Sequence, residues 1–159
     1  MGGSPLNQLT QVDPQIRGAT FAINLIAHPP EPVRTVLSTI QDTLERRIPG
    51  NVLFRCPLHS LHLSVFQFVW ARHGDARAEA LWTTCCDRVL SHLARIANST
   101  QAFPLRSPSI HAGQSAIIVK FSTSDALEAL REQVLAVARE TDLSWNRPVI
   151  QHVSIFRYT

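Results

Sequence analysis

Short apolar runs and longer stretches of helical periodicity alternate along the chain. The runs typical of strands cover residues 20–27, 52–54, 61–70, 103–111, 115–121 and 149–158. Apolar residues recur at helical spacing in 31–47, in 75–97 and in a stretch that follows Ser122-Thr123-Ser124 and ends near residue 140. The pattern therefore predicts an α+β domain.

The order of these elements forms an internal repeat. Residues 20–68 predict strand, helix, break and strand, and residues 115–158 predict the same order. Each half is too small to bury a good core alone, so we expect the halves to pack together with a cleft between them. The prediction is one domain over residues 19–159 with two similar lobes, helices on the outside and sheets lining the cleft. Residues 1–18 are polar and rich in turn formers, and we expect them to form a flexible extension.

The last strand of each half carries the same five-residue pattern. The first copy is His62-Leu-Ser-Val-Phe66, and the second is His152-Val-Ser-Ile-Phe156. Successive side chains of a strand point to opposite faces, so the histidine and the serine of each copy share a face. Two such pairs in one small domain predict a symmetric cleft in which His62 and His152 face each other.

Strand alternation also assigns the neighbouring side chains. Phe66 and Phe68 share the predicted face of His62, and Phe156 and Tyr158 share that of His152. These aromatic side chains are candidates to stack on a base or ribose. Alternatively, the phenylalanines fill the floor of the cleft. Gln67 and Arg157 occupy equivalent positions after the two motifs, and alternation places both away from the cleft. A twist at the strand end could bring Arg157 round to a phosphate.

Two imidazoles and two hydroxyls in one cleft suit phosphodiester chemistry. A neutral histidine can take a proton from a nucleophile while a protonated one gives a proton to the leaving oxygen. Serine hydroxyls can bind the non-bridging oxygens of the phosphate. Cys56, His59 and His62 also have zinc-like spacing, but His59 and His62 differ in strand parity and no second ligand pair accompanies them. We therefore expect no metal and no cofactor.

Composition narrows the choice of partner and compartment. The net charge is +3, and the cations are fourteen arginines and one lysine, which mildly favours an anionic partner. The basic residues are scattered, with no stripe for duplex DNA. Three cysteines, two of them adjacent, fit a reducing compartment. No apolar run is long enough for a membrane span, and the N-terminus lacks a signal-peptide layout. We expect a cytoplasmic monomer.

The paired motifs HLSVF and HVSIF resemble the two His-x-Ser/Thr motifs of the 2H phosphoesterase superfamily, which includes 2′-5′ RNA ligase-like proteins and cyclic phosphodiesterases. The resemblance covers roughly residues 20–159. It implies a bilobal fold of antiparallel sheets and a metal-independent site. The catalytic residues that it implies are His62, Ser64, His152 and Ser154.

The same resemblance implies an activity. The reaction would open a 2′,3′-cyclic phosphate on a nucleotide or a single-stranded RNA terminus. The alternatives are 2′-5′ RNA ligation, cleavage of 2′-5′ or 3′-5′ oligonucleotides, and a module that binds a nucleotide or RNA end without turnover. Which histidine is the acid and which the base stays open at this point.

Overall fold

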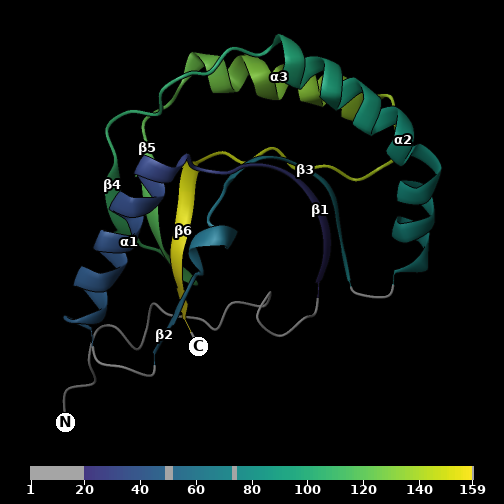
Figure 1. Ribbon diagram of the computed structural model, residues 1–159. Coiled ribbons are helices and arrows are strands. Elements are labelled where there is room, and N and C mark those ends of the chain that lie inside the picture. The colour runs from purple at the N-terminus through teal and green to yellow at the C-terminus, as the bar shows by residue number, and fades with distance from the viewer. Residues whose placement is uncertain (1–19, 49–51, 73–74, 159) are drawn as a thin grey trace.

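The computed structural model describes residues 20–48, 52–72 and 75–158, and it places one sheet and three α-helices in them (Figure 1). The predicted extension over 1–18 lies outside the described residues. The elements are β1 (Thr20–Ala27), α1 (Glu31–Glu45), β2 (Leu53–Arg55), the 3-10 turn η3 (Leu58–Ser60), β3 (Leu63–Arg72), α2 (Ala76–Ser99), β4 (Ser109–Ala112), β5 (Ala116–Phe121), α3 (Asp125–Arg139) and β6 (Gln151–Tyr158).

The sheet is antiparallel and divides near its middle. Its strand order is β1-β3-β6-β5-β4, and β2 pairs with the C-terminal half of β6. Among the described residues, β3 and β6 pair only at Leu63 and Val153. The strands separate beyond this pair, so β1 and β3 form one lobe while β4, β5 and β6 form the other. The predicted α+β fold with two lobes is confirmed.

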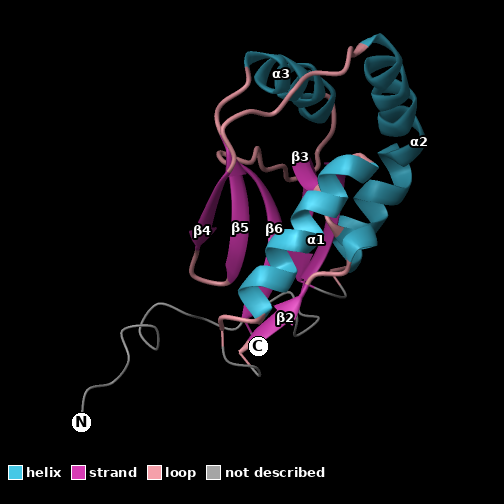
Figure 2. Ribbon diagram, turned by 60° about the vertical axis from the view of Figure 1, so that its left-hand side comes forward, coloured by secondary structure: helices cyan, strands magenta, loops and turns pink. Residues whose placement is uncertain are grey.

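Helices α1 and α3 each pack against a strand from the other half of the repeat. Helix α1 follows β1 but contacts β6, and α3 follows β5 but contacts β3. Figure 1 shows α2 and α3 together above β3, and Figure 2 shows α1 as a separate column at a distance from α3. Each half therefore covers apolar surface of the other, which explains how two small repeats share one core. In the described part of the chain, no helix has the length and apolarity needed to cross a membrane.

Helix starts follow local side-chain chemistry. The Asp75 carboxylate accepts hydrogen bonds from the amides of Arg77 and Ala78, which begins α2. The Ser124 hydroxyl accepts from the amide of Leu127 at 3.4 Å, which begins α3. Both caps satisfy amides that the first turn of a helix leaves without partners.

One predicted strand is mostly irregular. The pattern predicts a strand over 103–111, but β4 covers only Ser109–Ala112. Pro104 and Pro108 interrupt the segment, and proline cannot donate a hydrogen bond to a neighbouring strand. Ser107 has a φ of 51°, in the left-handed region rather than the strand region. The alternation of apolar residues was therefore misleading in this segment.

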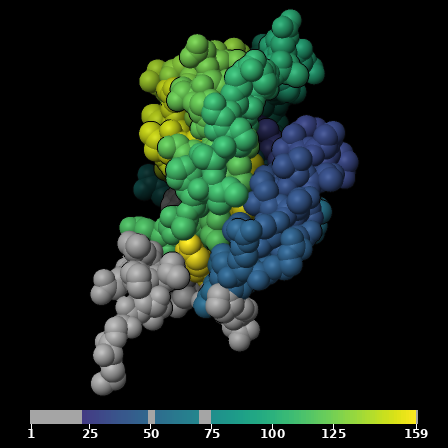
Figure 3. Space-filling model, turned by 90° about the vertical axis from the view of Figure 1, so that its left-hand side faces the viewer, coloured from purple at the N-terminus to yellow at the C-terminus, as the bar shows by residue number. Residues whose placement is uncertain are grey.

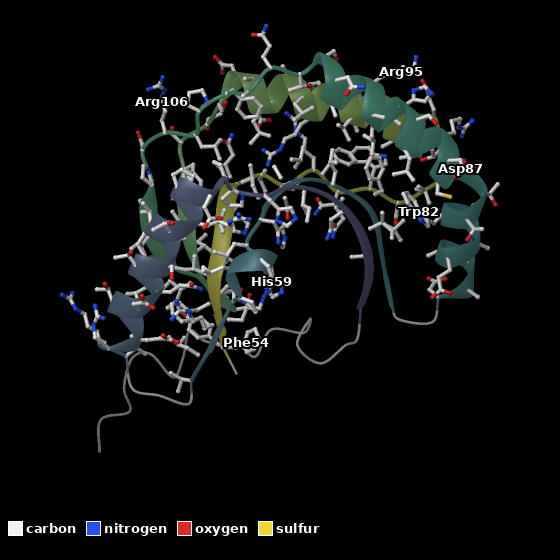
Figure 4. The ribbon with its side chains drawn as sticks, viewed as in Figure 1. Phe54, His59, Trp82, Asp87, Arg95 and Arg106 are labelled. Atoms are coloured by element: carbon white, nitrogen blue, oxygen red, sulfur yellow. The ribbon has the colours of Figure 1, made fainter. Side chains whose placement is uncertain are left out.

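The core lies between the sheet and the helices. Trp82 of α2 projects toward β3, as Figure 4 shows, and its ring centroid lies 6.4 Å from that of Phe68. Phe66 packs against Phe68 with 5.1 Å between ring centroids. On the other lobe, Figure 3 shows the chain around β4 and β5 in green beside α1 in blue, with the yellow C-terminal part of the chain between them. This packing leaves the opposite face of the sheet available for a site.

Candidate active site

The two motifs lie on neighbouring antiparallel strands, β3 and β6, where the two lobes meet. Leu63 pairs with Val153 in antiparallel register. Residues flanking such a pair lie opposite each other and share a face of the sheet. His62 therefore lies beside Ser154, and Ser64 beside His152, in a pseudo-twofold arrangement.

A cleft of about 620 Å³ opens over this junction. The four residues of the paired motifs line it, and all four are partly exposed. The structure thus brings His62, Ser64, His152 and Ser154 to one site, although their catalytic role stays a prediction. The further lining residues are Asn24, Gln67, Gly113, Gln114, Ser115, Ala116, Ile118, Asn146, Pro148, Val149, Ile150 and Arg157.

A β-bulge follows the serine of each motif. Ile26 pairs with Ser64 and Leu25 with Phe66, so Val65 is passed over in the pairing with β1. In β6, Ser154 and Phe156 pair with successive residues of β5, so Ile155 is passed over in the same way. An extra residue in one strand shifts its alternation by one position, and side chains beyond the bulge change face.

The bulges overturn the predicted faces of the aromatic residues. Phe66, Phe68 and Phe156 are at most 1% exposed, and Tyr158 is 9% exposed. These side chains belong to the core, and they do not line the cleft. The prediction that they share the histidine face is wrong, because regular alternation was carried through strands with extra residues, at Val65 and Phe68 in β3 and at Ile155 in β6. Outside the cleft, these rings have no geometric basis for stacking on a ligand there. Burial raises the pKa of the Tyr158 hydroxyl.

The same shift turns Gln67 and Arg157 into the cleft. Alternation places both away from the site, yet both line it. Arg157 stands five positions after His152, and Gln67 stands five positions after His62. Burial lowers the pKa of Arg157. Its guanidinium still carries a positive charge, because arginine is not deprotonated in proteins. That Arg157 lies near a bound phosphate stays a prediction, but it now rests on the bulge rather than on a twist at the strand end.

The ring orientation of His62 is set by its own chain. Its Nδ1 lies 2.7 Å from the carbonyl oxygen of Ser60. A carbonyl can only accept, so Nδ1 carries the proton in this contact. The Nε2 atom makes no hydrogen bond to the described residues, which leaves it for a ligand in the cleft. The carbonyl accepts the Nδ1 proton equally well when the ring is cationic.

His152 has a more enclosed environment. Its Nδ1 is buried with no partner in hydrogen-bonding geometry among the described residues. Burial lowers the pKa of His152, the charges of His62 and Arg131 lower it further, and the Ile150 carbonyl only partly offsets them. A buried imidazole resists protonation because the cation loses solvation. Both rings line the same cleft, which fits the influence of the His62 charge on the pKa of His152.

The polar character of the cleft favours an anion. Among the described residues, those that line it include one arginine and two histidines, and none is an aspartate or a glutamate. Neither motif serine donates its hydroxyl to another described residue, so both hydroxyls can bind a ligand. A cation and several neutral donors in one cleft fit a phosphate group.

Sequence patterns contain no sign of the two asparagines in the cleft. Asn24 lies on β1, and Asn146 lies in the loop before β6. The backbone of Asn146 bridges to that of Gln67, and its Nδ2 donates to the Gln67 side-chain oxygen at 3.3 Å. Only comparing the two repeats position by position marks Gln67, as the counterpart of Arg157. The two asparagines come from tertiary packing.

The zinc-like spacing does not form a metal centre in the described residues. Cys56 is buried, and burial raises its pKa to about 11, which disfavours the thiolate that zinc would need. His59 is exposed on η3 (Figure 4). No group of three or more His, Cys, Asp or Glu side chains gathers to hold a metal in the part of the chain that the structure describes.

Comparisons with known proteins bear on the fold. No family model matches the chain, and no curated protein matches it. Among solved structures, the PDE domain of MHV ns2 matches with a TM-score of 0.57 and 12% identity, over 88% of this chain and 84% of that domain. TT0787 of Thermus thermophilus matches with a TM-score of 0.49 and 17% identity, over 88% of this chain and 74% of that protein. The first likeness shows that the chain shares the fold of that PDE domain.

Proposed function

We propose that the protein is a metal-independent phosphodiesterase that opens 2′,3′-cyclic phosphates on a nucleotide or a single-stranded RNA terminus. One observation carries the proposal. Two His-Ser pairs and an arginine line a single cleft. The resemblance of HLSVF and HVSIF to the paired motifs of 2H phosphoesterases supports it, and so does the fold shared with a PDE domain.

The environments of the two histidines suggest a division of roles. His152 is held neutral by burial, so its Nε2 can take a proton from water. The oxygen of that water attacks phosphorus, and the bond from phosphorus to one ring oxygen breaks. His62, whose Nδ1 is held by the Ser60 carbonyl, gives the Nε2 proton of its cationic form to the leaving oxygen. The product is a phosphate monoester, and the net reaction consumes one water.

Three side chains are placed to bind the phosphate. The hydroxyls of Ser64 and Ser154 and the guanidinium of Arg157 line the cleft beside the imidazoles. Negative charge grows on the non-bridging oxygens as water attacks, so fixed donors near them stabilise the transition state. A cyclic phosphate already holds its leaving oxygen in place, which lowers the demand for further positioning.

The dimensions of the cleft favour a small ligand. Its volume of about 620 Å³ falls within the range of small-molecule sites. A nucleotide or the terminal nucleotide of an RNA strand fits such a space, whereas a duplex would need a longer basic surface. The amides of Asn24 and Gln67 can bind the ribose or the base edge.

The direct test offers purified protein a panel of 2′,3′-cyclic nucleotides and short RNAs with cyclic ends, with EDTA present. We expect each active substrate to give a single monoester, detected by phosphorus NMR. Calorimetry on the same ligands separates binding from turnover. Tight binding without product would favour the binding module, and absence of both would reject the proposed substrates.

The pH dependence follows from the environment of His152. Its pKa is lowered from the ordinary value of 6.5, so the ring stays neutral into more acidic solution. We therefore expect a bell-shaped profile of kcat/KM whose acid limb lies below pH 6.5. Stopped assays in buffers of constant ionic strength measure this. An acid limb well above that pH would contradict His152 as the base.

Replacement of Arg157 should weaken phosphate binding. We expect Arg157→Met to lower kcat/KM by about 10- to 100-fold, because one charge-assisted contact in a cleft is lost. Arg157→Lys keeps the charge but not the planar fork, so its loss should be smaller. Gln67→Met removes a neutral group from the equivalent strand position, so its loss should be smaller than that of Arg157→Met. An equal loss in the two variants would show that the positive charge of Arg157 has no special role.

A further inference from the structure

The carbonyl of the bulged residue in β3 is bound by a buried arginine. Val65 is passed over in the pairing with β1, so its carbonyl needs a partner outside the regular strand pairing. Arg131 of α3 donates from Nε to the Val65 carbonyl at 3.0 Å and from Nη2 to the Ser64 carbonyl at 3.2 Å. The guanidinium thus binds two successive carbonyl oxygens, one on each side of the Val65 Cα.

The bulge in β6 has an equivalent partner on the other helix. Gln41 of α1 donates from Nε2 to the Ile155 carbonyl at 2.8 Å and to the Cys56 carbonyl at 2.8 Å. The Cys56 amide also donates to the Ile155 carbonyl, at 3.1 Å. Val65 and Ile155 are the residues that directly follow the two motif serines. In each half of the repeat, one buried side chain therefore donates a hydrogen bond to the carbonyl of the bulged residue.

Burying the polar side chains of Arg131 and Gln41 costs desolvation free energy unless their hydrogen bonds offset it. Arg131 and Gln41 are 0% exposed. Arg131 keeps a carboxylate partner, since its Nη1 lies 2.7 Å from Glu128 Oε1, but an apolar residue would avoid the desolvation cost altogether. The buried carbonyls explain why polar side chains are retained, because an orphaned backbone acceptor would cost free energy of its own.

We propose that Arg131 and Gln41 are positioning residues that hold the bulges of β3 and β6 and thereby set the geometry of the cleft. Each bulge decides which side chains beyond it face the site. In β3 it turns Gln67 into the cleft and Phe66 into the core, and in β6 it does the same for Arg157 and Phe156. The kinetic part of this inference rests on the proposed function, whereas the structural part does not.

Backbone amide exchange followed by NMR tests the structural part without any assay of activity. The Gln67 amide, which donates to the Asn146 carbonyl at 3.0 Å, reports on β3, and the Cys56 amide reports on β6. We expect Arg131→Met to speed exchange at Gln67 by about tenfold or more beyond the change elsewhere in the sheet. Gln41→Met should do this at Cys56 instead. Arg95→Met, at an exposed site on α2, is the control for loss of one charge.

Kinetics with a cyclic nucleotide test the functional part. Small displacements of reacting groups lower kcat strongly, so we expect Arg131→Met to reduce kcat by about 10- to 100-fold while KM changes less than about threefold. Arg131→Lys keeps the charge and can reach one carbonyl, and it should recover part of kcat. Arg131→Lys also replaces the methionine variant in both measurements if the latter fails to fold.

The outcomes separate the two proposals. Faster exchange at Gln67 in Arg131→Met and at Cys56 in Gln41→Met supports the positioning roles. If the wild type shows no turnover of cyclic phosphates while this exchange pattern is observed, only the proposed function fails. Exchange that rises uniformly over the sheet in both variants overturns the inference. Wild-type turnover that stays unchanged in a folded Arg131→Met protein overturns it as well.

Discussion

Replacement of either motif histidine by alanine is expected to lower kcat/KM for a 2′,3′-cyclic nucleotide by about 10³-fold or more. His62 and His152 line one cleft, and in the proposed mechanism one ring takes a proton while the other gives one. Removing one proton carrier should therefore disable the step that needs both. The double variant should fall little further than either single variant, because residues that act together are not additive.

His59→Ala provides the matched control. His59 is exposed and stands three positions before His62, so its replacement should leave kcat/KM within about twofold. Circular dichroism and thermal unfolding should show all variants folded. Turnover that survives in His62→Ala or His152→Ala would reject the mechanism. A loss in His59→Ala as large as that in His62→Ala, restored by added zinc, would instead favour the zinc interpretation.

Phe156→Ala is expected to lower the free energy of unfolding by about 3–5 kcal/mol. The side chain is 0% exposed and packs in the core, so its removal leaves a cavity that the surroundings cannot fill completely. A small domain has a total stability of only about 5–15 kcal/mol, so this loss should be conspicuous in urea unfolding. The effect on substrate affinity should be indirect.

Phe54→Ala is the control for the same substitution at a surface position. Phe54 is 49% exposed on β2, and its replacement should cost far less (Figure 4). Phe156→Leu, which keeps most of the volume, should fall between the two. If Phe156→Ala were as stable as the wild type but raised KM, the aromatic ring would contact substrate after all, contrary to its burial.

Most of the fold could be predicted from periodicity. The bounds of β1, α1, α2, β5 and α3 lie within a few residues of the predicted segments, because apolar spacing and polar caps act locally. The segment 103–108 was assigned wrongly, since prolines there outweigh the alternation of apolar residues. The 3-10 turn over Leu58–Ser60 had no recognisable pattern.

Strand alternation placed the four motif residues of the candidate site on the correct face, but it misplaced the residues that follow them. His62, Ser64, His152 and Ser154 precede the bulges, so simple alternation assigns them to one face correctly. Phe66, Phe156 and Arg157 follow the bulges, so alternation assigns each of them to the wrong face of the sheet. A bulge leaves no local signature at Val65 or Ile155, because its partners, Arg131 and Gln41, are distant in sequence.

The sequence by itself determined the repeat, the alternating elements and the two matched His-Ser pairs, since these depend on spacing within single strands and helices. Only the tertiary structure decided what surrounds the pairs. Helices α1 and α3 each pack on a strand of the other half, and a side chain of each binds the carbonyl of the bulged residue there. The bulges in turn place Arg157 in the cleft and the aromatic rings in the core. Contacts between residues some 66 to 114 positions apart set this arrangement, and periodicity carries no information over such distances.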